Sequence, residues 1–252
     1  MTITASRLPL LVNCSAPASP AFWLKKDRTG DSAKFGNAIH LLAEMYIKQH
    51  PHSVEAACIA EGVAEPEHAR AGRVWANLLA WLPGEGELAG MRAEVPYGWD
   101  MHTGQTTELK LSGKREYLVG PTCIAGTADI VLLADGKLSV WDIKTGFSSP
   151  ESYRWQQRAL GCMAMIATGA TECRVAILHA GEVECAETWV EHLDRESVVD
   201  LTDLLKDLLA DSKKANPRPG PHCDAHYCGG RDRCNTYRAA FGKKPYTGKV
   251  TT

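Results

Sequence analysis

The order of local patterns in the sequence predicts an α/β fold with a central mixed sheet and helices on both faces. Helical periodicity covers residues 31–82, and strand-like alternation covers residues 93–145. Residues 149–211 combine a helix, two strands and a further helix. Helices, then strands, then helices mixed with strands are typical of α/β and α+β proteins. A chain of 252 residues can also bury a sizeable core without disulfides.

The composition indicates a folded globular protein. Hydrophobic residues make up 44% and charged residues 23% of the chain, which excludes collagen-like, coiled-coil and fully disordered classes. The apolar run at residues 8–12 is too short for a signal peptide, and no stretch approaches the ~18 apolar residues of a membrane span. We therefore expect a cytoplasmic protein, in which clustered cysteines favour metal binding over disulfides.

The charge is distributed unevenly along the chain. The net charge is −2, yet residues 212–252 hold nine Lys or Arg and two Asp, a net of +7, which leaves −9 for residues 1–211. This asymmetry predicts a core at residues 1–211, followed by a basic, cysteine-rich tail at residues 212–252 that packs on it. Such a tail is typical either of polyanion binding or of a solvated terminus.

Three helices are expected in the first third of the chain. Asp31 or Ser32 suits the N-cap of a helix whose apolar spacing continues to about His50. A short helix is expected at residues 53–61. A third helix, at residues 66–82, begins at a proline, whose fixed backbone angle suits the first helical position.

A β-hairpin at residues 127–144 is the clearest single element. Its two strands, residues 127–134 and 137–144, flank the dipeptide Asp135-Gly136, which is the strongest short-range hairpin signal. A two-residue loop pairs positions whose numbers sum to 271. Apolar residues occur at both alternating sets of positions, so we expect both faces of the hairpin to be buried.

The remaining core segments continue the mixed pattern. A helix is expected at residues 149–168, strands at residues 173–179 and 184–190, and a final helix at residues 194–211.

Two acidic residues are predicted to face each other near the open end of the hairpin at residues 127–144. Asp129 pairs with Asp142 in the register, which places their β-carbons ~5 Å apart, and Lys144 follows on the same face. Buried like charges either raise a pKa or bind a cation, and Mg²⁺ or Mn²⁺ suits oxygen ligands. The lysine can hold a phosphate or a nucleophilic water. Alternatively, Asp142 and Lys144 end the strand in solvent.

The segments Gly-Thr-Ala-Asp at residues 126–129 and Trp-Asp-Ile-Lys-Thr-Gly at residues 141–146 resemble the core of the PD-(D/E)xK nucleases. The sequence is most similar to the RecB-type branch, which includes CRISPR-adaptation nucleases and phage exonucleases. The resemblance implies a restriction-endonuclease-like core with a central mixed sheet flanked by helices.

Three further residues occur in the order of that branch. His40, four residues after a glycine, corresponds to a histidine that contributes to the metal site. Gln157 corresponds to a glutamine near the nucleic acid, although Gly161 replaces the tyrosine that usually follows, and Gln156 offers a second register. Glu94 corresponds to a glutamate that helps to organise the metal. Outside this family, the same residues would be ordinary helix or surface side chains.

The cysteines of the tail predict a metal site. Three lie within twelve residues of one another: Cys223, Cys228 and Cys234. Cys14 is the candidate fourth ligand, because a subset of RecB-type nucleases uses one early and three late cysteines to hold a 4Fe-4S cluster. The gap between the first two tail cysteines departs from the usual family spacing. Structural Zn²⁺ is the alternative, since His222 and His226 lie within the run. Either group would form a metal-cluster clasp joining the chain termini.

The resemblance implies a Mg²⁺- or Mn²⁺-dependent deoxyribonuclease. The metal would be bound by His40, Asp129, Asp142 and the carbonyl of Ile143. Lys144 would orient or deprotonate the attacking water, and Gln157 would contact the substrate or the lysine.

An exonuclease of phage or mobile-element recombination is the first hypothesis for the biological role. The alternatives are a CRISPR spacer-acquisition nuclease and a non-catalytic DNA-binding accessory protein. The expected partners are DNA and either a recombinase, a single-strand-binding protein or a CRISPR adaptation protein, with no membrane.

Overall fold

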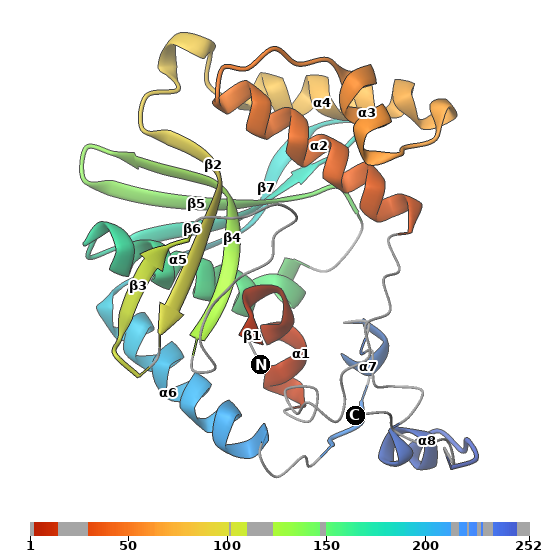
Figure 1. Cartoon of the computed structure of the whole chain (residues 1–252), viewed down its shortest axis with the longest axis vertical. Coiled ribbons are helices and arrows are strands. Elements are labelled where there is room, and N and C mark those ends of the chain that lie inside the picture. The colour runs from red at the N-terminus through yellow and green to blue at the C-terminus, as the bar shows by residue number, and fades with distance from the viewer. Residues whose placement is uncertain are drawn as a thin grey trace.

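The computed structural model describes residues 3–14, 30–100, 102–109, 123–146, 150–212, 217–220, 222–225, 228 and 234–245. In these residues a central mixed sheet lies between two layers of helices (Figure 1). Each face of the sheet carries its own buried apolar cluster, so both faces are covered. The predicted α/β fold with a mixed sheet flanked by helices is confirmed.

The three helices expected early in the chain cover one face of the sheet: α2 (Asp31–Ile47), α3 (Val54–Glu61) and α4 (His68–Trp81). Helix α2 is capped by Gly30 rather than by Asp31 or Ser32. Asp31 is instead the first helical residue, where its carboxylate favours the positive end of the helix dipole. Ser53 caps α3, because its hydroxyl accepts a hydrogen bond of 3.1 Å from the backbone N–H of Ala56.

Six strands form the path of the sheet in the order β3-β2-β4-β5-β6-β7: β2 (Met91–Asp100), β3 (Gln105–Glu108), β4 (Cys123–Ala134), β5 (Lys137–Lys144), β6 (Cys173–Ala180) and β7 (Cys185–Leu193). The pair β5–β6 is parallel, and the other neighbours on this path are antiparallel. A parallel pair needs a crossover connection, which α5 (Arg154–Thr168) supplies. Residue 149, where this helix was expected to begin, lies outside the described residues.

The predicted hairpin register is confirmed. Strands β4 and β5 pair from Ala134 with Lys137 to Ile130 with Trp141, so each pair of numbers sums to 271. Asp135 has φ 51° and its neighbour Gly136 has φ 73°. Two positive φ angles are the mark of the turn type that an Asp-Gly loop favours. The side chains of the two alternating sets belong to different apolar clusters, as expected for a hairpin buried on both faces.

The N-terminal segment joins the sheet, which the sequence patterns did not predict. It comprises β1 (Ile3–Thr4), a short 3-10 turn (Ala5–Arg7) and α1 (Leu8–Asn13). Strand β1 runs parallel to β4, with Ile3 beside Ile124. A Cβ at Gly126 would lie 2.8 Å from Ala5 Cβ, so glycine is needed there for this close approach.

The second face of the sheet is covered by α1, α5 and α6 (Arg195–Ser212). Two short helices follow in the tail, α7 (His222–Ala225) and α8 (Asn235–Ala240). The division into a core at residues 1–211 and a tail at residues 212–252 stays a prediction. None of the helices described here is long and apolar enough to cross a bilayer.

Candidate active site

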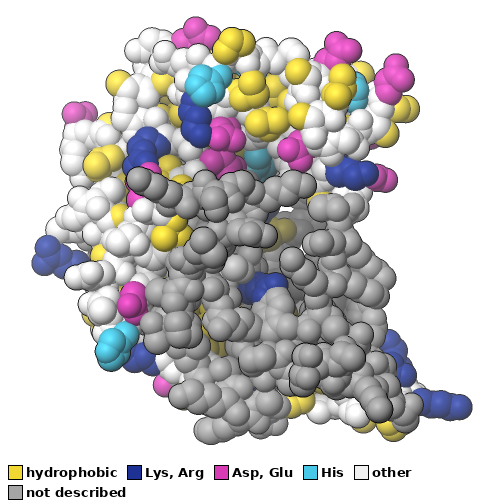
Figure 2. Space-filling view, viewed as in Figure 1, with side chains coloured by type: hydrophobic (Ala, Val, Ile, Leu, Met, Phe, Trp, Pro, Cys, Tyr) yellow, Lys and Arg dark blue, Asp and Glu magenta, His cyan; other side chains and the backbone are white. Residues whose placement is uncertain are grey.

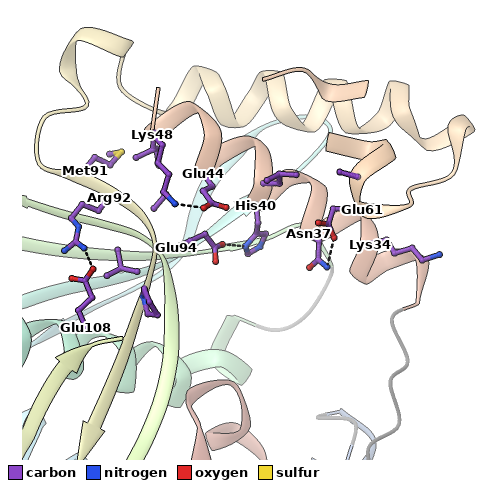
Figure 3. A pocket seen from close by; sticks show the side chains of 16 residues that line it. Lys34, Asn37, His40, Glu44, Lys48, Glu61, Met91, Arg92, Glu94 and Glu108 are labelled. Atoms are coloured by element: carbon purple, nitrogen blue, oxygen red, sulfur yellow. Dashed lines mark hydrogen bonds and ion pairs between the residues drawn. The ribbon is translucent and has the colours of Figure 1, made fainter. Parts of the chain in front are cut away.

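His40, Glu94 and Asp129 meet where α2 approaches strands β2 and β4. Each offers one ligand atom, and these three atoms lie within 4.8 Å of one another. In the described part of the chain, this is the one such group of histidine, cysteine or acidic side chains. Figure 3 shows the imidazole of His40 and the carboxylate of Glu94 pointing toward each other. The fold therefore brings together residues that are separated by up to 89 positions in the sequence (129 − 40).

Glu94 reaches this position through an unusual backbone conformation. Its φ is 51°, in the left-handed region that side chains other than glycine rarely adopt. The β2–β4 ladder pairs Ala93 with Ile130 and Val95 with Ala128, but it omits the pair between them, Glu94 and Asp129. Such a conformation costs about 1–3 kcal/mol and is concentrated at functional sites. The strain at Glu94 therefore indicates that this carboxylate has a role beyond strand pairing.

The two carboxylate oxygens of Asp129 contact different parts of the structure, one the sheet and the other the metal-ligand group. Its Oδ2 accepts a hydrogen bond of 2.7 Å from the backbone N–H of Ile143, and its Oδ1 lies 3.3 Å from His40 Nδ1. The β4–β5 ladder ends at the pair of Ile130 and Trp141. Beyond it, the carboxylate of Asp129 takes the place of a backbone carbonyl as the acceptor for the N–H of Ile143. Burial disfavours the charged carboxylate. Even so, the positive charge of His40 holds the pKa of Asp129 below its usual range.

His40 has both ring nitrogens directed at oxygen atoms. Its Nε2 lies 3.0 Å from the carbonyl oxygen of Ile143 and donates to it, because a carbonyl can only accept. Its Nδ1 is buried without a hydrogen-bond partner, 3.3 Å from Asp129 Oδ1 and 3.5 Å from Glu94 Oε1. Burial favours the neutral ring, but the two carboxylates outweigh it and raise the pKa of His40 to about 10.

The buried Asp142 forms an ion pair with the half-buried Lys144 beside this group. The second oxygen of Asp142 accepts a hydrogen bond of 2.8 Å from Gln156 Nε2. Burial and the nearby Asp129 raise the pKa of Asp142 despite the lysine. Burial would lower the pKa of Lys144, but the two aspartates raise it. The lysine ammonium also lies 4.9 Å from the ring centre of Tyr153, within cation–π range.

One placement differs from the sequence-based expectation. Gln157 is fully buried and neither polar atom of its side chain has a hydrogen-bond partner, whereas Gln156 faces the site. Neighbouring residues on a helix point in different directions, so a shift of one position decides which glutamine faces the site. Asp142 engages Lys144, and the carbonyl of Ile143 accepts from His40, so the role of these two groups as metal ligands stays a prediction.

The compact group suits a hard divalent cation. Two carboxylates and one imidazole are ligands that Mg²⁺ and Mn²⁺ accept. His40 Nδ1 is a buried nitrogen without a hydrogen-bond partner, and it faces two carboxylate oxygens. A metal-binding histidine commonly donates its other N–H to a backbone carbonyl, which is what His40 does to Ile143. Glu94, the least specific of the family-based expectations, belongs to this group.

Two cavities border the site. A groove of about 1370 Å³ lies between α2, the end of α3 and strand β2, and Figure 3 shows the side chains along it. Its basic residues are paired with acidic ones, such as Lys48 with Glu44 and Arg92 with Glu108. Figure 2 likewise shows acidic and basic side chains interspersed over this part of the surface. A second cavity of about 320 Å³ includes Lys144 and Gln156, and His40 lines both cavities.

The cysteines expected to bind a metal come from both ends of the chain. Cys14 ends α1, and its sulfur accepts a hydrogen bond of 3.2 Å from the backbone N–H of Arg218. The tail cysteines pack into one small cluster with Tyr237: Cys223, Cys228 and Cys234. Helix α7, which carries the first of them, contacts α1. The metal site expected at these four cysteines stays a prediction. His226, a candidate zinc ligand, lies outside the described residues.

Comparisons with known proteins agree with the geometry at the level of the family. Residues 2–235 match the family model described as the PD-(D/E)XK nuclease superfamily. No curated protein gives a significant match. One similar solved structure is described as "Crystal structure of SSO0001". It is 17% identical, the alignment covers 90% of this chain and 95% of that chain, and the TM-score is 0.38.

Proposed function

Because the chain belongs to the PD-(D/E)XK nuclease superfamily, whose members are metal-dependent hydrolases, we propose that it is a Mg²⁺- or Mn²⁺-dependent DNA exonuclease. One observation carries this proposal. His40, Glu94 and Asp129 form a compact ligand group directly beside the ion pair of Asp142 and Lys144. A cation site next to a positively charged side chain is the arrangement that phosphodiester hydrolysis requires.

His40 Nδ1, Glu94 and Asp129 would hold the cation. When bound, a divalent cation lowers the pKa of a water molecule and offsets negative charge on a phosphate. The hydrogen bond from His40 Nε2 to Ile143 fixes the imidazole so that Nδ1 faces the carboxylates. The expectation that Asp142 and the Ile143 carbonyl also bind the cation stays a prediction.

Lys144 would orient the nucleophilic water and stabilise the charge that develops on the phosphate. Its ammonium is fixed by Asp142 and lies near the ring of Tyr153, so little reorganisation is needed during reaction. Gln156 holds the other oxygen of Asp142 and thereby positions the ion pair. We assign this positioning role to Gln156 in place of Gln157.

We further propose that Cys14 and the three tail cysteines hold a structural 4Fe-4S cluster, with Zn²⁺ as the alternative. The support for this proposal is the order of the four cysteines, one before the core and three after it, which matches the cysteine order of the RecB-type subset. Zinc is the alternative because His222 and His226 lie within the cysteine run.

The proposed pathway is phage or mobile-element recombination, with a recombinase or single-strand-binding protein as partner. Its support is the resemblance of the motifs at residues 126–129 and 141–146 to phage exonucleases. The genes beside this one distinguish the alternatives. Recombinase or single-strand-binding genes support the proposal, whereas CRISPR adaptation genes would overturn it.

A cleavage assay tests the proposed activity. The protein is incubated with linear and circular DNA, single- and double-stranded, in Mg²⁺, Mn²⁺ or EDTA. We expect metal-dependent loss of linear DNA only, and we expect Asp129→Asn to abolish it. Asp135→Asn is the matched control, because Asn-Gly forms the same hairpin turn and lies away from the site. Cutting of circles would contradict the exonuclease assignment, and DNA binding without cleavage would favour an accessory protein.

A further inference from the structure

The smaller of the two cavities is built partly by the N-terminal segment. Thr4, Ala5 and Ser6 line one side of it, Gly126 and Thr127 of β4 lie next to them, and α5 supplies Gln156 and Leu160. The segment is anchored by buried apolar side chains, since Ile3 and Ala5 are at most 2% exposed. Its position is therefore part of the fold.

The N-terminal segment alternates apolar residues with hydroxyls. Ile3 and Ala5 pack into the core, whereas Thr4 is half-buried and Ser6 is exposed. The hydroxyl oxygens of Thr4 and Ser6 lie 3.2 Å apart at the cavity. Anchoring the segment requires only the apolar positions, so core packing does not account for this pair of hydroxyls.

The chemistry of this cavity fits a phosphate-bearing ligand. Three hydroxyls, of Thr4, Ser6 and Thr127, line it together with the ammonium of Lys144. The carboxylates of Asp129 and Asp142 line it as well, and the cation proposed above would offset their negative charge toward a phosphate. Hydroxyl and ammonium groups are common partners of phosphate oxygens. The volume of about 320 Å³ lies at the lower end of small-molecule sites, which suits one nucleotide better than a continuous strand.

We propose that this cavity, the terminal-nucleotide pocket, binds the last nucleotide of a DNA strand, with Thr4 and Ser6 donating hydrogen bonds to its phosphate. This inference rests on the proposed exonuclease function and extends it. His40 lines both cavities, Glu94 lines the groove and Asp129 lines the pocket, so the metal-ligand group borders both. The rest of the strand would lie along the groove. Cleavage at the metal-ligand group releases mononucleotides, and a free mononucleotide inhibits the enzyme as a product.

The test measures binding of 2′-deoxyadenosine 5′-monophosphate by calorimetry in Ca²⁺. This ligand has no phosphodiester bond, so binding is measured without any cleavage. The variant is Thr4→Val with Ser6→Ala, and the matched control is Ser32→Ala with Thr107→Val, two exposed hydroxyls outside both cavities. We expect the variant to bind about tenfold more weakly for each hydroxyl lost. We expect the control to match wild type, and Mn²⁺ affinity to be equal in all three proteins. The single variant Ser6→Ala, at an exposed position, shows the same direction of change if the double variant folds poorly.

Two outcomes overturn the pocket: wild type does not bind the mononucleotide, or the variant binds it as tightly as wild type. Either result can occur with full DNA cleavage, in which case the nuclease assignment stands alone. Conversely, Thr4- and Ser6-dependent mononucleotide binding without any DNA cleavage would support the pocket and overturn the exonuclease.

Discussion

At two residues of the site, Glu94 and Asp129, the position of the carboxylate conflicts with regular strand pairing. Glu94 accepts a strained backbone so that its carboxylate reaches His40. Asp129 uses one oxygen for the sheet and leaves the other for the metal-ligand group. Both features remove one pair from a β-ladder, and both are explained by cation binding better than by stability.

Two replacements of Glu94 distinguish the backbone strain at this residue from the role of its carboxylate as a metal ligand. Glu94→Gly relieves the positive φ, whereas Glu94→Gln keeps it, so we expect the glycine variant to be more stable by about 1 kcal/mol in EDTA. Both variants lose one carboxylate, and we expect both to bind Mn²⁺ more weakly. Urea unfolding and calorimetry measure the two effects. Equal stability of the two variants would show that the backbone here is unstrained.

Metal binding is expected to release a proton from His40. In the metal-free protein its pKa is raised to about 10, so Nδ1 is protonated at neutral pH. A proton and a cation compete for this nitrogen, and raising the pH removes the proton. The affinity for Mn²⁺ therefore increases with pH, by up to about tenfold per unit below pH 10.

Calorimetry in buffers of different ionisation enthalpy measures this proton release directly. We expect close to one proton released per Mn²⁺ at pH 7.5 in wild type, and a smaller release together with weaker binding in His40→Asn. An affinity that is constant between pH 6.5 and 8.5 would argue against His40 as a ligand.

At the scale of elements, the N-terminal segment depends on a glycine in the neighbouring strand. A Cβ at Gly126 would lie 2.8 Å from both Ala5 Cβ and Leu160 Cδ2, which is closer than real contacts allow. The segment and α5 therefore approach β4 together at this one residue. The same contact shapes the terminal-nucleotide pocket.

We expect Gly126→Ala to destabilise the protein by about 1–3 kcal/mol through overpacking, and to loosen residues 3–7. Urea unfolding gives the stability, and limited proteolysis reports release of the N-terminal segment. Gly86→Ala is the matched control, because nothing lies within 4 Å of a Cβ at that position. Similar losses in both variants would show that the contact at Gly126 is unimportant.

At the scale of the whole molecule, helix α1 contacts described segments of the tail. Helix α1 ends at Cys14, and the tail reaches it through the backbone of Arg218 and through α7 (Figure 1). Because α1 continues from the segment that lines the terminal-nucleotide pocket, a cluster on Cys14 would stabilise that segment as well as the tail.

Loss of one cluster ligand is expected to affect both metal content and stability. For Cys14→Ser purified without oxygen, we expect less bound iron, or less zinc under the alternative, and a lower melting temperature. Cys185→Ser serves as the control, because Cys185 on β7 packs against a different apolar cluster from Cys223, Cys228 and Cys234. A Cys14 variant with full metal content and unchanged stability would contradict the proposed cluster.

Local chemistry was enough to predict the hairpin and the helices. An Asp-Gly turn permits one register, so the alignment of residues 130–134 with 137–141 followed from the turn alone. Periodicity placed α2 to α4 within a few residues of their bounds. The segment at residues 3–13 was missed, because two strand residues and a six-residue helix are too short to show a period.

Turn chemistry and apolar spacing act between near neighbours, so they were enough to predict the fold class and the hairpin register that pairs residues 130–134 with 137–141. His40 was inferred from the family resemblance. The tertiary structure was needed to show that Glu94 joins His40 and Asp129, that Gln156 rather than Gln157 faces Asp142, and that Thr4 and Ser6 border the site. These choices depend on packing between elements distant in the chain. A rotation of one helical position or one strained φ angle changes them without altering any local pattern.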